Sequence, residues 1–479
     1  MKYNHALFLN PYIERSVTSA MKMFPPTGLE YVATSAAKYV NKLTLLDLRY
    51  EEKLSEVNNL LEFIAREIDI VCVGIGWDRQ LKEIYGLLNA MPDNIPLVIG
   101  GYTATEKVEE IFAGCPNVTV IVRGEGEETI REILSGAEMN TILGISYRSD
   151  GQIVHNANRP LPEVKDIACP DRALRRSKYQ LTLNGVSIAG LTFDTVLSSR
   201  GCPFNCKFCT FSLNPLGQKR NYSARPAESV VDEIEGIDAK IILFSDENFC
   251  VDAKRTEEIC DLIIARKIKK RFAAQVRLDI AKYPVLLEKM VKAGFKALLL
   301  GIESPHDRIL AQLNKGFDSA GIRKSFAVLR KYPIFYHGYF IYGNIGETEE
   351  EMLYIARFAR EIGVDSITFL KLRIEKFSPL REIALNTPGY HITADGKLYS
   401  DAYSVAALKK IGRRIKFAYY NPPKFLQMLG KLRRIHFFTG QELVSLVSLL
   451  PRILGSVIKT EIQKGRLAES LRRTFISNR

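Results

Sequence analysis

Three cysteines in one short loop are the side chains of this sequence best placed to do chemistry. Cys202, Cys206 and Cys209 follow the spacing C-x3-C-x2-C. Three thiolates can hold three irons of a four-iron, four-sulfur cluster. Because no fourth cysteine lies nearby, the fourth iron would stay open to an outside ligand, as in a reactive rather than a structural metal site. The alternative is a zinc knuckle, but structural zinc needs four protein ligands, usually with a second pair close in sequence.

The cysteine loop resembles the signature of the radical S-adenosylmethionine (SAM) enzymes, in which an aromatic residue precedes the third cysteine. Phe208 takes that place here. The resemblance implies that SAM chelates the open iron through its amine and carboxylate groups. It also implies that an electron donor such as flavodoxin or ferredoxin drives the cleavage of SAM to methionine and a 5′-deoxyadenosyl radical.

Apolar strands alternate with amphipathic helices around and after the cysteine loop. The first of these strands is expected from Thr192 to Ser198, and the last ends at Leu372. The six strand-helix units of this region predict a partial TIM-type (β/α)6 barrel. In such a barrel the chemistry lies at the carboxyl ends of the strands.

Polar residues at those strand ends, together with Phe208, are the predicted SAM-binding residues. Arg277 could fork onto the SAM carboxylate, although a structural ion pair would also explain it. The resemblance places Glu303 beside the SAM amine and ribose. Asp246 has a second interpretation, because Asp246 or Asn248 could cap the following helix. The full set is Phe208, Asp246, Glu247, Gln275, Arg277, Glu303, Ser304, Tyr339 and Ile341, of which the last two lie on the strand that resembles the adenine-packing strand of the family.

The first 140 residues also alternate strand-like and helix-like runs, including helices from Gly28 to Val40 and from Gln80 to Ala90. This alternation predicts an α/β domain with a doubly wound, Rossmann-like or flavodoxin-like parallel sheet, whose binding loops follow the strands. The details resemble the cobalamin-binding (B12-binding) domain that precedes many radical SAM cores. The resemblance implies that cobalamin is bound by Pro26, Gly28, Leu29, Asp47, Gly76, Trp77, Gly100, Gly101, Thr103, Gly124, Glu125 and Gly126.

Two features of this domain depart from the usual cobalamin pattern. The Asp-x-His-x-x-Gly motif is absent, because Asp47 is followed by Leu-Arg-Tyr and no histidine of that loop can coordinate cobalt. The usual Ser-x-Leu is replaced by Gly76-Trp77-Asp78, in which Trp77 could cover one face of a ligand. The alternatives are a flavodoxin-like domain without its cofactor and a nucleotide-binding domain, although no Gly-x-Gly-x-x-Gly follows the first strand.

The excess of basic residues is confined to the last segment of the chain. Residues 405–479 hold 16 Lys or Arg and 3 Asp or Glu, a net charge of +13 that equals the charge of the whole chain. Aromatic residues interleave with the basic ones, which predicts amphipathic helices in a membrane interface. A helical bundle that covers the barrel and an RNA-binding segment are the alternatives. From Pro422-Pro423 onward, the segment resembles the C-terminal helices of the bacteriochlorophyll cyclase and hopanoid methylase type, whose substrates are hydrophobic ring systems.

The length of the chain and its cysteines indicate the number of domains and the cellular compartment. A chain of 479 residues has room for two or three domains. Its eight cysteines do not suggest a disulfide framework, and a reducing cytoplasmic compartment suits thiolates and a cluster. The first residues hold too short an apolar stretch for a signal peptide. The predicted domains are a cobalamin-binding-like domain (1–140), a connector (141–187), a radical SAM core (188–404) and a basic, helical C-terminal region (405–479).

These features together predict a cytoplasmic radical SAM enzyme with peripheral contact at the inner face of the membrane. The predicted cofactors are a 4Fe-4S cluster, SAM and cobalamin. The predicted reaction is methylation of an unactivated carbon in a hydrophobic lipid, isoprenoid or tetrapyrrole-like substrate. Oxidative cyclisation or rearrangement without methyl transfer is the first alternative. The alternative from another class is a non-catalytic iron–sulfur sensor bound to membrane or RNA, but a sensor needs no SAM pocket and nucleic acid is not the expected partner.

Overall fold

The fold is given by a computed structural model, which describes residues 2–13, 21–183, 185–209, 213–453 and 455–456. The chain divides into two compact units, each with its own sheet and its own buried apolar residues. The first unit comprises Met1–Pro162, Asp166–Asp194 and Gly440–Arg479, and the second comprises Glu163–Lys165 and Thr195–Thr439.

The first unit is built on a seven-stranded sheet with the order β2-β1-β3-β4-β5-β6-β7. The first five strands in this order run parallel, and β6 and β7 add an antiparallel hairpin at one edge. Parallel strands covered on both faces read as continuous apolar runs, and every residue of β1 is buried. The strands are β1 (His5–Asn10), β2 (Lys42–Asp47), β3 (Ile70–Gly74), β4 (Leu97–Gly100), β5 (Val120–Val122), β6 (Ile145–Ser149) and β7 (Gln152–His155).

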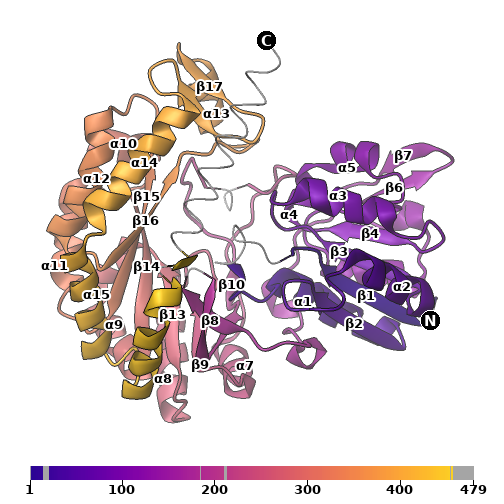
Figure 1. Cartoon of the computed structure of the whole chain (residues 1–479), viewed down its shortest axis with the longest axis horizontal. Helices are drawn as coiled ribbons and strands as arrows, with labels where there is room; N and C mark the ends of the chain where they lie inside the picture. The colour runs from indigo at the N-terminus through magenta and orange to yellow at the C-terminus, as the bar shows by residue number, and fades with distance from the viewer. Residues whose placement is uncertain (1, 14–20, 184, 210–212, 454, 457–479) are drawn as a thin grey trace. The chain divides into compact units, whose positions relative to one another are not determined.

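Helices cover both faces of this sheet, so the unit is doubly wound as predicted (Figure 1). Phe8 of β1 packs with the face that carries α1 and α6, whereas its neighbours Leu7 and Leu9 pack with the other face. Because the connections after β1 and β3 leave toward opposite faces, a topological switch point lies between these strands. The helices are α1 (Thr27–Ala36), α2 (Val57–Glu67), α3 (Leu81–Ala90), α4 (Tyr102–Glu106), α5 (Val108–Gly114) and α6 (Glu127–Ser135), with short 3-10 turns at Ala37–Tyr39, Met139–Thr141 and Arg172–Leu174.

The second unit is a curled sheet with helices along its outer side, which is the partial barrel that the sequence predicts (Figure 1). Five strands run parallel in the order β16-β15-β14-β13-β12. The order continues through β9 (Val186–Val196) to β8 (Gln180–Leu183), and the chain passes from the first unit to the second within β9. The parallel strands are β12 (Ile241–Phe244), β13 (Arg271–Val276), β14 (Phe295–Glu303), β15 (Phe335–Tyr342) and β16 (Ser366–Lys371).

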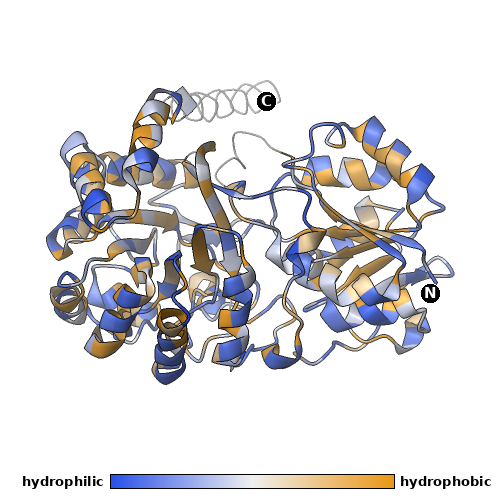
Figure 2. Ribbon diagram, turned by 90° about the horizontal axis from the view of Figure 1, so that it is seen from below, coloured by the Kyte–Doolittle hydropathy of each residue, from blue (hydrophilic) through white to orange (hydrophobic). Residues whose placement is uncertain are grey.

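The helices of the second unit follow its strands in sequence, and their apolar faces pack on the sheet. In Figure 2 the strands are mainly apolar, whereas the surrounding helices carry both polar and apolar residues. This amphipathic pattern is the one from which helices were predicted. The helices are α7 (Ala227–Gly236), α8 (Ala253–Ala265), α9 (Pro284–Ala293), α10 (Asp307–Gln312), α11 (Ser319–Leu329) and α12 (Glu349–Ile362), with 3-10 turns at Val164–Asp166 and Leu278–Lys282.

Two basic helices, α14 (Val405–Tyr419) and α15 (Pro422–Arg434), are fastened to the second unit near the start of β16. Buried Lys424 donates to the Val364 carbonyl at 2.7 Å, and Lys431 pairs with Asp365 at 2.8 Å. Among the described residues, no helix is both long and apolar enough to cross a bilayer. Of the predicted basic segment, residues 454 and 457–479 lie outside the described residues. The smaller elements are β10 (Ser199–Arg200), β11 (Ser223–Ala224), α13 (Leu380–Leu385), β17 (Tyr390–Ile392) and β18 (Leu398–Ser400).

Candidate functional site

The cysteine loop begins directly after β10 and starts with a glycine that no other residue can replace without strain. Gly201 has a φ of +85°, and a Cβ atom there would meet the backbone oxygens of Arg220, at 2.7 Å, and of Asn221. Left-handed backbone of this kind is the conformation in which glycine is favoured. Downstream, Cys206 is buried while Cys202 and Cys209 are partly exposed. The loop therefore holds its thiols close to the surface of a rigid turn.

Hydrogen bonds from distant segments hold the loop on both sides of its second cysteine, Cys206. The Lys207 amide donates to the Leu313 carbonyl at 3.0 Å, and the Asn314 side chain donates to the Asn205 carbonyl at 2.8 Å. On the other side, the Ser378 hydroxyl donates to the Lys207 carbonyl at 2.6 Å. The loop is thus anchored by the residues that follow α10 and by the segment before α13.

The donor set of the loop fits an iron–sulfur cluster better than a single metal ion. None of the three cysteines is engaged in a disulfide. Three thiolates can hold three irons of a cluster and leave the fourth iron open. A structural zinc ion needs a fourth protein ligand, which the loop does not supply.

Asp246 and Glu247, which follow β12, both reach the start of the cysteine loop. Asp246 is fully buried and accepts from the Ser198 amide at 2.7 Å and from the Ser199 hydroxyl at 2.8 Å. Burial raises the pKa of Asp246. Glu247 accepts from the Gly201 amide at 3.0 Å. The two carboxyl groups join the end of β12 to the residues that lead into the cysteines.

The alternative reading of Asp246 or Asn248 as a helix cap is wrong. Helix α8 begins only at Ala253, and its N-cap is Asp252, whose side chain accepts from the Arg255 amide at 3.0 Å. Asn248 is buried, and its Oδ1 atom has no hydrogen-bond partner among the described residues.

Arg277, at the end of β13, directs its guanidinium toward the cysteine loop. Its Nη1 lies 3.6 Å from Cys206 Sγ, and its Nη2 donates to the Lys315 carbonyl at 2.7 Å. Its Nε donates to Asp279 at 3.2 Å, which is the ion pair considered as the alternative. The guanidinium carbon lies 3.8 Å from the centre of the Phe204 ring. The predicted contact between Arg277 and SAM would compete with these protein contacts.

A buried ion pair between Glu303 and Lys315 lies at the end of β14. Lys315 Nζ is 2.9 Å from Glu303 Oε1, and both side chains are more than nine-tenths buried. Glu303 has a φ of +69°, a strained conformation of the kind that gathers at functional sites. A Cβ atom on Gly301 would lie 2.7 Å from Glu303 Oε1 and 2.9 Å from Lys315 Nζ, so this glycine provides the space for the pair.

Lys315 connects three of the predicted site residues and was not itself predicted. Its ammonium lies 5.6 Å from the centre of the Phe208 ring, while its backbone carbonyl accepts from Arg277. Phe208 also packs against the apolar cluster that contains Ile341. The sequence shows only a lysine before Gly316, near the end of α10. Its importance appears once the structure shows it buried, because lysine is rarely buried unless it is paired. The pattern of strand ends did not reveal it, because Lys315 lies on a helix-terminal turn.

The remaining predicted SAM residues lie on the same strand ends. Tyr339 of β15 is opposite Gly301 of β14 in the sheet register. Its ring meets the His337 ring edge to face at a centroid distance of 4.9 Å. Ser304 is fully buried and accepts from the His306 amide at 3.2 Å. Gln275 of β13 is half-buried, and its backbone carbonyl accepts from the Phe249 amide at 2.9 Å.

In the first unit, most of the predicted cobalamin residues meet at the carboxyl edge of the parallel sheet. Gly101 has a φ of +102°, and a Cβ atom there would lie 2.7 Å from the Ile75 carbonyl oxygen. This close approach of the β3 and β4 ends requires glycine. By contrast, Gly28 and Gly76 have no described atom within 4 Å of where a Cβ atom would stand. The edge therefore leaves open space beside its backbone, which suits a bulky flat ligand. Pro26, Leu29, Gly100, Thr103, Gly124, Glu125 and Gly126 lie in or beside the loops and helix starts after β1, β4 and β5.

Asp47 and Trp77 are held by protein groups at the same edge. Buried Asp47 accepts from Asn10, at 2.9 Å, from Arg49, at 2.6 Å, and from the Tyr179 hydroxyl, at 2.9 Å. The Trp77 ring packs against the Tyr12 ring in a tilted arrangement with a centroid distance of 5.0 Å, and the Trp77 amide donates to the Tyr12 hydroxyl at 2.7 Å. Asp47 is thus the centre of an internal hydrogen-bond network, and Trp77 fixes the start of the loop after β1.

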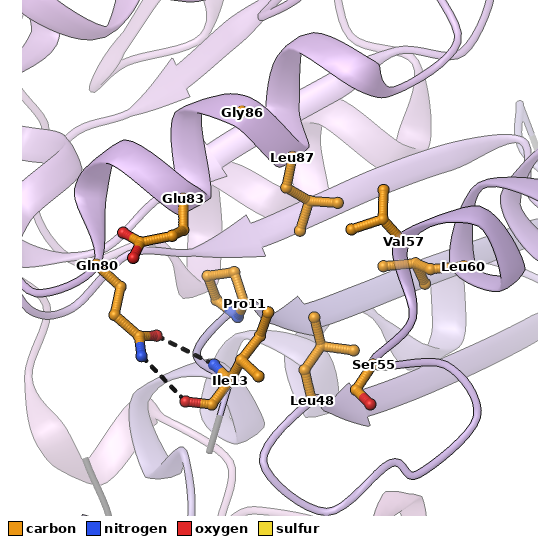
Figure 3. Close-up of a pocket in the computed structure, with 10 residues that line it drawn as sticks. All are labelled: Pro11, Ile13, Leu48, Ser55, Val57, Leu60, Gln80, Glu83, Gly86 and Leu87. Atoms are coloured by element: carbon orange, nitrogen blue, oxygen red, sulfur yellow. Dashed lines mark hydrogen bonds between the residues drawn. The ribbon is translucent and has the colours of Figure 1, made fainter. Parts of the chain in front are cut away.

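A separate pocket of about 270 Å³ lies between α2 and α3, and it is lined by none of the predicted residues (Figure 3). In Figure 3 the apolar side chains of Leu48, Val57 and Leu87 point toward one another. Gln80 closes one end, because its amide both donates to and accepts from the backbone of Ile13 at 3.1 Å. The other lining residues are Pro11, Ser55, Leu60, Glu83 and Gly86.

Comparisons with known proteins agree with this arrangement. Residues 196–359 match the model of the radical SAM superfamily. The chain is 27% identical over 421 residues to an uncharacterized methyltransferase, PH0819, of Pyrococcus horikoshii, covering 84% of this chain and 89% of that protein. It is 28% identical over 396 residues to the anaerobic magnesium-protoporphyrin IX monomethyl ester cyclase of Cereibacter sphaeroides, covering 78% of this chain and 62% of the cyclase.

The fold has a solved counterpart over most of its length. The chain superposes with a TM-score of 0.68 on the radical SAM methyltransferase TsrM from Kitasatospora setae, a structure with cobalamin and a 4Fe-4S cluster bound. The superposition covers 88% of this chain and 89% of that one, at 16% sequence identity. At this identity the likeness concerns the fold alone, and it extends over parts of both units of this chain.

Proposed function

The chain is a radical SAM enzyme, and we propose that it methylates an unactivated carbon of a hydrophobic small molecule in a cobalamin-dependent reaction. The observation that carries this proposal is the combination, in one chain, of a loop with three cysteines outside any disulfide and a glycine-lined edge of a doubly wound sheet. The methyltransferases among the similar proteins support it.

The three cysteines of the loop would hold the cluster, and the loop anchors would keep them in place while the cluster is exchanged or reduced. When bound, the cluster supplies the electron that cleaves SAM, and cobalamin supplies the methyl group. Asp246 and Glu247 orient the backbone at the start of the loop through Ser198 and Gly201. Both residues were predicted to bind SAM, and their part in this proposal is to position the cysteines.

The amino-acid part of SAM carries an amine and a carboxylate. The Glu303–Lys315 pair offers a carboxylate for the first group and an ammonium for the second. In the proposed complex, Glu303 binds the amine and Lys315 binds the carboxylate, while Phe208 and Ile341 supply the apolar side of the site. Tyr339 lies one strand away from Gly301 and completes the wall. Charge-assisted hydrogen bonds of this kind are stronger than neutral ones.

In the first unit, Gly76, Gly100 and Gly101 would let cobalamin approach the backbone at the edge of β3 and β4. Trp77 would cover one face of it, since its ring is already fixed by Tyr12. Gly28 and Leu29 stand at the start of α1 on the same edge, and Leu29 lies against Gly74 of β3. Asp47 supports this edge from inside through its hydrogen bonds to Asn10 and Arg49.

A hydrophobic substrate and a peripheral membrane contact are the finer parts of the proposal. The similar cyclase is named for a porphyrin ester. On α14 and α15, Phe417, Phe425 and Leu426 have 73%, 52% and 69% of their surface exposed, and basic residues surround them in sequence. Exposed apolar side chains among Lys and Arg favour binding to an anionic membrane surface. There the apolar side chains leave water and the basic ones are attracted to the lipid headgroups.

Oxidative cyclisation without methyl transfer is the second candidate, and the match to the cyclase favours it. The deciding experiment purifies the protein without oxygen, supplies cobalamin, and measures cobalt, iron and products of SAM. Stoichiometric cobalt with both 5′-deoxyadenosine and S-adenosylhomocysteine supports methylation, because methyl transfer consumes a second SAM. A four-iron cluster and 5′-deoxyadenosine without bound cobalt would refute methylation through cobalamin and leave cyclisation. Intact SAM in the presence of a reduced cluster would refute both.

A further inference from the structure

We propose that Arg277 sets the reduction potential of the cluster by holding a fixed positive charge against Cys206. This inference rests on the proposed function, which puts a cluster on the three cysteines. Arg277 Nη1 lies 3.6 Å from Cys206 Sγ. From the sequence, Arg277 was predicted to bind SAM, and the present proposal gives it a role at the cluster.

The guanidinium is fixed in this place on its other sides. Nη2 donates to the Lys315 carbonyl at 2.7 Å, Nε donates to Asp279 at 3.2 Å, and the plane lies 3.8 Å from the Phe204 ring centre. Arg277 is nine-tenths buried, so rotation away from Cys206 would break contacts that water cannot readily replace. An arginine also keeps its charge at every pH at which proteins are folded.

The sign of the effect follows from electrostatics. Reduction adds one electron, and so one negative charge, to the cluster. A fixed cation stabilises the more negative form, and a hydrogen bond to a ligating sulfur acts in the same direction. Arg277 should therefore raise the midpoint potential and make the cluster easier to reduce. Its partner Asp279 should act in the opposite direction, because that carboxylate offsets part of the positive charge.

The test is a redox titration of the full-length protein with its cluster assembled, followed by electron paramagnetic resonance. In Arg277→Gln we expect about a tenfold lower ratio of reduced to oxidised cluster at a fixed potential, equal to about 59 mV for one electron. The midpoint potential of Arg277→Lys should lie between those of Arg277→Gln and the native protein, because lysine keeps the positive charge but lacks the planar guanidinium with its several N–H donors. Asp279→Asn should shift the potential upward. Arg308→Gln is the matched control, because Arg308 pairs with Glu351 away from the loop.

The affinity for SAM distinguishes a role of Arg277 at the cluster from the predicted role in SAM binding. If Arg277 serves the cluster, Arg277→Gln should keep the dissociation constant for SAM on the oxidised protein within about threefold, since no SAM contact is removed. Native potentials in both Arg277→Gln and Asp279→Asn would overturn the inference. If Arg277→Gln fails to retain iron, the direction of the Asp279→Asn shift decides: upward supports the inference and unchanged overturns it. Failure of the native protein to assemble a four-iron cluster would instead refute the proposed function.

Discussion

The two units place their candidate binding residues at the same kind of position, the carboxyl ends of parallel strands, but they build them from opposite kinds of residue. The first unit uses glycines such as Gly76 and Gly101, which leave space or let backbones approach. The second uses charged groups such as Glu303, Lys315 and Arg277, which are buried and paired. The glycine-lined site of the first unit should be lost when a side chain is added to a glycine. The charged site of the second unit should be lost when one member of a buried ion pair is removed.

The largest effect is expected where a buried charge loses its partner. Lys315→Met leaves the Glu303 carboxylate buried and unpaired, which should lower the free energy of unfolding by about 3–5 kcal/mol. Urea denaturation of the cofactor-free protein measures this, and equilibrium dialysis should show weaker SAM binding. The double variant Lys315→Met/Glu303→Gln should recover part of the stability. Lys289→Met, which removes the surface ion pairs with Glu257 and Asp261, should lower the free energy of unfolding much less. Equal losses in the two single variants would contradict the importance of burial.

The corresponding change in the first unit is the addition of one methyl group. Gly101→Ala places a Cβ atom 2.7 Å from the Ile75 carbonyl oxygen in a left-handed conformation, and we expect a loss of about 1–3 kcal/mol. Thermal unfolding and cobalt retention are the measurements. Gly86→Ala on α3 is the control, because nothing lies within 4 Å of its added atom and alanine favours the helix. If Gly101→Ala bound cobalamin and unfolded like the native protein, the close approach of β3 and β4 would not matter.

A smaller effect concerns pH and the polar interior of the second unit. His337 contacts the hydroxyls of Ser366 at 2.7 Å and Thr368 at 3.0 Å, and burial lowers the pKa of His337 to about 4. The folded state therefore keeps His337 neutral, while the unfolded chain protonates it below about pH 6.5. Stability from this residue is complete above pH 6.5 and is lost as the pH falls toward 4, by up to about 1.4 kcal/mol per pH unit.

Urea denaturation at pH 7.5, 6 and 5 checks this pH dependence. The variant His337→Gln cannot take up the proton and should show a flatter decline with acid, whatever its stability at pH 7.5. An identical slope in the native protein and the variant would show that His337 is not the residue responsible.

The smallest effect is expected at the surface of α14 and α15. Phe417→Ser/Leu426→Ser removes two exposed apolar side chains, so folding should be unchanged while cosedimentation with vesicles of anionic phospholipid falls by about tenfold. Vesicles of neutral phospholipid serve as the reference for both proteins. Val285→Ser, on α9 and also 60% exposed, is the control for loss of any apolar surface residue. Equal binding of all three proteins would refute a membrane contact through these helices.

The fold and the cysteine loop could be predicted because both depend on local patterns. Apolar runs and helical periodicity identified the strands and helices, with errors at their ends. The helix expected from Gly28 to Val40 ends at Ala36 and continues as a 3-10 turn, and the strand expected from Thr192 to Ser198 is Val186–Val196. Boundaries are set by hydrogen bonds and tertiary packing, which the local pattern does not contain.

The parts that could not be predicted are contacts between residues far apart in the chain. Asp47 was expected to face a ligand, but Tyr179, 132 positions away, donates to it. Lys315 became visible only when the end of α10 came next to Glu303, and Asp252 rather than Asp246 caps α8. The pocket between α2 and α3 depends on the spacing of two helices, for which no sequence pattern exists.

The pairing of Glu303 with Lys315 has a consequence for selectivity among small molecules. While the pair is closed, each charge neutralises the other inside an apolar shell. In the proposed complex, the amine and the carboxylate of SAM replace the contacts that Glu303 and Lys315 lose when the pair opens, so that opening costs little. A related nucleoside that has lost either its amine or its carboxylate would leave one protein charge stranded without a partner. If SAM binds at this pair as proposed, discrimination against such molecules comes from the free-energy penalty of the unpaired charge rather than from extra attraction for SAM.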